Sequence, residues 1–237
     1  MSPIGVTVNP LRRTGVLAGI LFLVTHVTSV GAVALYGPML TDAGWMDSDA
    51  SGLAQRLGAV LDVILAIAVV GTAVALLPVL RRPEPRSASA YLALRTLEAS
   101  VILLGAVAVL GALAVRGQHA AGSDAAGVAL LALYRAAFLV GPGLVIGANT
   151  LVLAAALRRT RLVPVWIPVL GLVGAPLVVL SNLAVLFGLQ SQVSPTAALA
   201  AVPIFAWEIS LAVYLIVRGP RAATRADAPD AVGVAAG

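Results

Sequence analysis

Long apolar stretches alternate with short polar segments along the 237 residues of the chain. A helix that crosses the hydrocarbon core of a bilayer needs about 20 apolar residues, at a rise of about 1.5 Å each. Membrane strands are shorter and alternate in polarity, and these stretches do neither. The pattern therefore predicts an all-α polytopic transmembrane bundle of six helices in one domain, residues 14–217. The predicted spans are residues 14–36, 57–80, 91–115, 128–157, 164–189 and 199–217.

The first stretch has an alternative interpretation. Arg12 and Arg13, the apolar run after them and Ala32-Val33-Ala34 also fit a secretory signal peptide with its cleavage site. The run is longer than the stretch of about 7–15 residues typical of such peptides, so we interpret it as a membrane span. Residues 1–13 then form a cytoplasmic N-terminal segment, and residues 218–237 are expected to be a disordered cytoplasmic tail.

Composition supports a membrane protein. Hydrophobic residues make up 60% of the chain and charged residues 11%, whereas soluble domains carry about 25% charged residues. The net charge of +5 would suggest nucleic acid in a soluble protein. Here the basic residues, all arginine, lie mostly beside apolar runs, so we expect membrane lipids as partners and no nucleic acid. The absence of cysteine excludes disulfides, thiolate metal sites and cysteine nucleophiles.

The arginines also predict the orientation of the chain. Eleven of those in connections and termini fall on one side of the membrane and two, Arg56 and Arg116, on the other. Because arginine and lysine accumulate in cytoplasmic loops, both termini are expected to be cytoplasmic. The predicted location is the bacterial cytoplasmic membrane. The eleven are Arg12, Arg13, Arg81, Arg82, Arg86, Arg158, Arg159, Arg161, Arg218, Arg221 and Arg225.

Five ionisable residues fall inside the predicted spans: Asp62, Arg95, Glu98, Arg135 and Glu208. A charge at the centre of a lone membrane helix costs at least about 2.5–3.5 kcal/mol. These side chains are therefore expected to face inward and form a buried network of arginines and carboxylates. Such a network serves either as an ion path or polar pocket, or as structural pairing that fixes which helix faces which.

Spacing and depth suggest how the network pairs. Arg95 and Glu98 are three residues apart and share a helix face. Asp62 and Arg135 lie at similar depth in the outer half of the membrane, counting the rise per residue. Two arginines meet three carboxylates, so one carboxylate is expected to lack a cation. We assign this to Glu208, which has no arginine on its own helix before Arg218.

The fourth span carries further candidates. Arg135, Pro142 and Asn149 recur every seven residues, which places them on one face of a 3.6-residue helix. Pro142 is expected to kink that helix. The flanking glycines either form a hinge that lines a cavity or allow close helix packing. Asn149 joins the candidate network, with His26 and Asn182 as possible contributors.

Catalytic, cofactor and metal signatures are not evident. The sequence has no phosphate-binding glycine loop, no HExxH and no GxSxG. The arginines beside the carboxylates disfavour a hard cation. We therefore predict no catalytic residues, no cofactor and no metal, and an enzyme is the less favoured interpretation.

Five short patterns, in order and at suitable spacing, resemble the bacterial multi-pass membrane proteins grouped as domain of unknown function 4386. The resemblance runs from about Arg13 to Gly219. The patterns are Ala18-Gly19-Ile20-Leu21-Phe22-Leu23, Leu61-Asp62, Arg95-Thr96-Leu97-Glu98-Ala99, Arg161-Leu162-Val163-Pro164-Val165-Trp166 with Gly171, and Glu208-Ile209-Ser210-Leu211 through Arg218-Gly219.

The resemblance implies the six-span architecture and draws attention to Asp62, Arg95, Glu98 and Glu208. It implies no substrate. One departure is Val165, where relatives often carry a basic residue after the proline.

Three functions fit the sequence. A small transporter or proton-coupled carrier predicts a cavity that reaches the network. A non-catalytic accessory or assembly protein predicts a sealed network, and a homo-oligomer or a membrane-protein partner would suit it. An intramembrane enzyme acting on lipid predicts a nucleophile beside the network.

Overall fold

The computed structural model describes residues 10–41, 45–46, 51–116, 122–192 and 194–221. All regular secondary structure in these ranges is helical, and six helical stretches are long and apolar enough to cross a membrane. The prediction of an all-α bundle with six spans is therefore confirmed. Most of the predicted N-terminal segment and tail lie outside the described residues. The elements are α1 (Pro10–Thr41), α2 (Leu53–Leu80), α3 (Pro85–Arg116), α4 (Ser123–Phe138), the π-helical segment η2 (Leu139–Val145), α5 (Ile146–Thr160), α6 (Trp166–Leu186) and α7 (Pro195–Val217).

Five of the six spans begin earlier than their apolar runs, and three of these begin at a proline: α1 at Pro10, α3 at Pro85 and α7 at Pro195. Proline suits the first helical position because its missing N–H would have no partner there. Ser194 completes the start of α7, since its hydroxyl accepts a hydrogen bond of 3.1 Å from the N–H of Ala197. Hydropathy marks only the part of each helix inside the bilayer.

The fourth span is one stretch of 38 residues, Ser123–Thr160, built from α4, η2 and α5. Pro142 lies within η2. A proline in an α-helix removes one hydrogen bond and clashes with the carbonyl four residues earlier. The π-helical segment accommodates it by widening the helix locally. The kink predicted from Pro142 thus takes the form of a π-helical segment.

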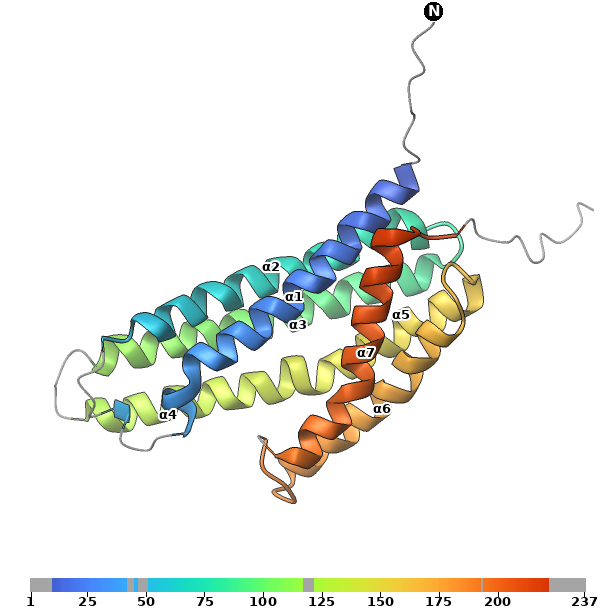
Figure 1. Ribbon diagram of the computed structural model, residues 1–237. Coiled ribbons are helices and arrows are strands. Elements are labelled where there is room, and N and C mark those ends of the chain that lie inside the picture. The colour runs from blue at the N-terminus through green and yellow to red at the C-terminus, as the bar shows by residue number, and fades with distance from the viewer. Residues whose placement is uncertain (1–9, 42–44, 47–50, 117–121, 193, 222–237) are drawn as a thin grey trace, which may run out of the picture.

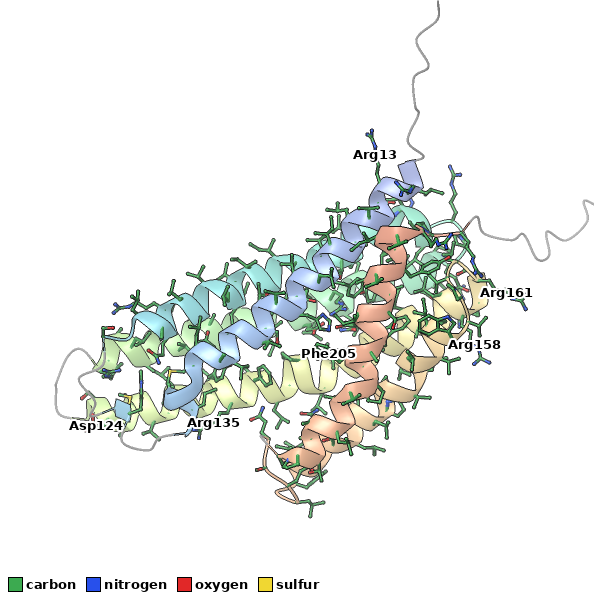
Figure 2. The ribbon with its side chains drawn as sticks, in the orientation of Figure 1. Arg13, Asp124, Arg135, Arg158, Arg161 and Phe205 are labelled. Atoms are coloured by element: carbon green, nitrogen blue, oxygen red, sulfur yellow. The ribbon has the colours of Figure 1, made fainter. Side chains whose placement is uncertain are left out.

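Helices α1 to α4 lie side by side, and α7 packs against both α1 and α6 (Figure 1). Helix α6 in turn packs against α5. The first residues of α1 and the last of α7 lie at the same end of the bundle, where the N–H of Arg221 donates to the carbonyl of Leu162 at 2.8 Å. Arg13, Arg158 and Arg161 gather there, and Asp124 lies at the opposite end (Figure 2). We call these the arginine-rich end and the opposite end.

Buried side chains fill the arginine-rich half of the bundle. Phe22, Leu153, Ile167, Trp207 and Leu211 belong to one apolar cluster there, to which all six spans contribute. A second cluster around Tyr36, Tyr134 and other residues joins α1, α3 and α4 nearer the opposite end. Large apolar side chains are also exposed along the outside of every span. Such a surface suits hydrocarbon, and the chain is accordingly an integral, multi-pass membrane protein by its architecture.

Candidate functional site

Arg95 is the centre of the buried polar network, and its side chain is only 4% exposed. Its Nη1 donates to Glu98 Oε2 at 3.0 Å and its Nη2 to Glu208 Oε1 at 2.8 Å. Its Nε donates to the hydroxyl of Tyr91 at 2.9 Å. Tyr91, Arg95 and Glu98 share one face of α3, because residues three or four apart lie one above another. Of these three hydrogen-bond partners of Arg95, Glu208 is the one from another helix, α7.

Asn149 ties the network to the fourth span. It is fully buried, and its Nδ2 donates to Glu98 Oε2 at 2.6 Å. Glu98 therefore accepts from both Arg95 and Asn149 at the same oxygen. This amide contact connects α5 to α3 inside the bundle.

His26 approaches the network from α1, and its contacts favour one tautomer of the ring. Its Nδ1 lies 2.8 Å from the carbonyl of Phe22, and its Nε2 lies 3.5 Å from Glu208 Oε2. A carbonyl can only accept, so Nδ1 carries a hydrogen. In neutral histidine Nε2 is then an acceptor, and it faces a carboxylate oxygen, which also only accepts when ionised. The contact is attractive when one proton lies between the two groups.

The three charged side chains of the network do not balance, and their net charge is negative. Arg95 supplies one positive charge, and Glu98 and Glu208 supply two negative ones. One proton held by His26 and Glu208 makes the sum zero, and its loss leaves one uncompensated negative charge. This arrangement overturns the prediction that Glu208 lacks a cation, because Glu208 meets both Arg95 and His26.

Among the described residues, Asp62 is the buried carboxylate that no arginine contacts. It is 6% exposed and accepts a hydrogen bond of 2.7 Å from the hydroxyl of Tyr36. The ring of Tyr134 packs edge-on against Tyr36, with centroids 5.1 Å apart. The cavity beside Asp62, about 10 Å³, has room for one water at most. Sequence reasoning missed the tyrosine hydroxyl because it considered charged partners alone.

Arg135 lies outside the network, contrary to the prediction. Its side chain is exposed, and its Nη2 donates to the carbonyl of Leu40 at 2.7 Å. Leu40 is in the last turn of α1, where carbonyls lack partners within the helix and favour a cation. The seven-residue spacing placed Arg135 on the face of Asn149, but η2 lies between them and does not follow the 3.6-residue period. The expected pair of Arg135 and Asp62 does not form.

Asn182 lies on the far side of the site, and within the part of the chain that the structure describes no hydrogen bond joins it to a charged side chain. Its Nδ2 donates to the carbonyl of Val178 at 2.8 Å in its own helix, α6. A Cβ atom added to Gly143 would come within 2.6 Å of Asn182 Oδ1. A Cβ on Gly147 would meet Val179 still more closely. The glycines therefore allow close packing between the fourth span and α6.

A cavity of about 410 Å³ extends from the charged network toward the opposite end of the bundle. At its inner end it is lined by His26, Arg95, Glu98 and Glu208. At its outer end it is lined by Gln192 and Ser194, in the connection between α6 and α7. Gln192 Nε2 also donates to the carbonyl of Arg135 at 3.4 Å, which joins this connection to α4. The remaining lining residues are Thr25, Ser29, Val30, Leu65, Val69, Ile102, Phe138, Pro142, Gly143, Ile146, Val178, Ser181, Asn182, Ala197, Ala198, Ala201, Ile204 and Phe205.

The cavity walls include residues that the sequence did not single out. Phe205 lies midway along α7 (Figure 2), and its ring meets that of His26 edge-on, with centroids 4.5 Å apart. Phe138 lines the wall from α4. The signal in the sequence was the position of Phe205, three residues before Glu208. The direction of the Phe205 side chain, however, depends on helix packing.

Among the described residues no group of three or more His, Asp or Glu side chains could hold a metal ion. The two carboxylates of the network already accept from Arg95. What the site offers chemically is a pair of groups able to take up and release a proton, His26 and Glu208, at the inner end of a cavity.

A family model described as Domain of unknown function (DUF4386) matches residues 17–219. The comparisons with curated proteins and with solved structures found no match. The matched residues include every member of the network and both ends of the cavity.

Proposed function

For this chain, which belongs to the DUF4386 family, we propose the function of a small proton-coupled carrier that takes a solute through the cavity. One observation carries the proposal: a cavity of about 410 Å³ ends on a titratable pair, His26 and Glu208, whose Nε2 and Oε2 atoms lie 3.5 Å apart. A carrier needs a binding site accessible from one side at a time, with a proton site in contact with it.

The two alternatives have less support. A sealed network was the expectation for an accessory or assembly protein, and this network borders a cavity. For an enzyme acting on lipid, a base must lie within reach of a nucleophile. His26 Nε2 faces Glu208 instead.

We further propose that the arginine-rich end faces the cytoplasm, with membrane lipids around the bundle. The support is the excess of arginine at this end, ten among the described residues against Arg56, Arg116 and Arg135 toward the other end. The cavity then faces away from the cytoplasm in this conformation. The bacterial cytoplasmic membrane is the location that suits this asymmetry.

Single cysteines offer a direct test, because the chain has none of its own. Ala201→Cys places a thiol on the cavity wall. Leu211→Cys places one in the apolar cluster between the network and the arginine-rich end, where the side chain is 0% exposed. A membrane-impermeant, charged thiol reagent is then added to either side of oriented vesicles.

For a carrier we expect Ala201→Cys to react from the side of the α6–α7 connection. Leu211→Cys should react from the arginine-rich side in part of the population, when that half opens. Val213→Cys, on the lipid-facing surface two residues further on, is the matched control and should stay unreactive. Reaction at Ala201→Cys with none at Leu211→Cys under any condition would indicate a fixed cavity and contradict the carrier.

A further inference from the structure

We infer that the cavity binds one organic monocation with apolar substituents, in exchange for the proton held between His26 and Glu208. The inference rests on the proposed carrier function and names the chemical class of its solute. It is argued from the charges that face the cavity and from the composition of the walls.

The charges around the His26–Glu208 pair can be summed element by element. Helix α3 presents Arg95 and Glu98 and α7 presents Glu208, while α1 presents His26. The fourth span presents the neutral amide of Asn149, and α6 presents Ser181 and Asn182. Asp62 of α2 lies in a separate small cavity. Without the shared proton the cavity therefore carries one net negative charge.

An uncompensated charge in a buried site costs several kcal/mol. A single positive charge removes that cost, and either a proton or a bound monocation can supply it. When a monocation enters, the O–H or N–H bond of the pair breaks and the proton leaves to water in the cavity. One cation is bound and one proton is released, so the charge of the site is unchanged.

The walls favour an organic cation over a metal ion or an anion. Phe138 and Phe205 line the cavity, and about half of the other lining residues are apolar. Aromatic rings attract cations that are poorly hydrated. A hard metal ion would need several free oxygen ligands, whereas both carboxylates are already bonded to Arg95. Arg95 would attract an anion only weakly, because the carboxylates of Glu98 and Glu208 already neutralise its positive charge.

The first experiment compares two ions of the same shape and opposite charge, tetraphenylphosphonium and tetraphenylborate, on the purified protein in detergent. We expect the cation to bind at least about ten-fold more tightly, a difference of about 1.4 kcal/mol. In weakly buffered solution the cation should release one proton per molecule bound. Because the cation and the proton compete, the affinity for the cation should fall as the pH is lowered. The expected loss is about ten-fold for each pH unit in the range where the pair is protonated.

Variants then locate the site. Glu208→Gln removes the negative charge and should weaken cation binding about ten-fold or more and abolish proton release. Glu208→Asp retains the charge and should bind within a few-fold of the wild type. Asp62→Asn is the matched control, since it removes a buried carboxylate outside this cavity. It should leave both binding and proton release unchanged.

The outcomes separate this inference from the carrier function. Equal binding of the two ions, or cation binding without proton release, would overturn the inference. If Leu211→Cys still reacts from the arginine-rich side, the carrier then stands with another class of solute. Cation binding with proton release but an unreactive Leu211→Cys would support the cation site and contradict the carrier.

Discussion

Two buried acidic sites in the same bundle are stabilised in different ways. Glu98 and Glu208 share the cation of Arg95 at the end of a cavity, whereas Asp62 has one hydrogen bond from Tyr36 beside a space for one water at most. The first site has charges that nearly balance and space for a ligand. The second is closely packed. The difference teaches that a buried carboxylate in a membrane span does not by itself indicate function. A carboxylate that borders a cavity large enough for a ligand does.

The largest expected effect is at the centre of the network. Arg95→Ala would strand Glu98 and Glu208 together in the interior. Removing one partner of a buried ion pair costs about 3–5 kcal/mol, so we expect a large fall in the detergent melting temperature. Glu208→Gln should cost less, because Arg95 retains Glu98 and Tyr91. Equal or reversed losses in thermal melts of the two variants would refute the pairing. Arg135→Ala serves as the control for loss of an arginine at the surface.

At the second site, Tyr36→Phe removes the hydroxyl that Asp62 accepts from. A buried acceptor left without its donor costs about 1–3 kcal/mol. We expect a drop in melting temperature with cation binding unchanged, since the cavity is not involved. Double substitution with Asp62→Asn measures the coupling. Additive losses would show that the hydrogen bond contributes nothing to stability.

Asn149→Ala sharpens the comparison from within the network. The substitution removes one donor to Glu98 while Arg95 remains bonded to the same oxygen. We expect a loss of about 1–2 kcal/mol in the free energy of unfolding, together with altered cation affinity. Thermal melts and tetraphenylphosphonium titration of the same preparation check both effects. A stability loss with unaltered affinity would make Asn149 structural only.

The smallest effect concerns the surface pair at the arginine-rich end. Arg159 donates to both oxygens of Glu84, at 2.8 and 3.0 Å, and these hydrogen bonds lower the pKa of Glu84. A carboxylate with a lowered pKa stabilises the fold at any pH above its ordinary pKa. This contribution disappears as the pH falls through the lowered pKa. Glu84→Gln should therefore melt slightly lower at pH 7 and like the wild type in strong acid. A difference that grows toward low pH would contradict this assignment.

The sequence predicted the spans and part of the site. Apolar length located the six spans, and the arginines marked one end of the bundle, because both properties are local. Arg95 and Glu98 were paired for the same reason, since three residues on one helix fix their geometry. The first turns of the helices that begin at Pro10, Pro85 and Pro195 lie outside the apolar runs, so the hydropathy pattern did not predict them.

Contacts between helices escaped sequence reasoning. Counting depth along each span paired Asp62 with Arg135, but depth says nothing about which face a neighbouring helix presents. His26 and Glu208 lie 182 positions apart in the sequence (208 − 26) and meet only because α7 packs on α1. Tyr36 is a neutral donor, so pairing residues by opposite charge could not identify it as the partner of Asp62.

The π-helical segment has a consequence for how this span tolerates changes in chain length. Residues 139–145 set the angle between the outer half of the span, where Arg135 reaches the rim, and the inner half, where Asn149 reaches Glu98. That angle depends on how many residues lie between the two halves as well as on their identity. Loss of a single residue there would let a regular α-helix form with the two halves nearly in their present phase, so this segment is expected to tolerate a deletion better than the α-helical turns beside it.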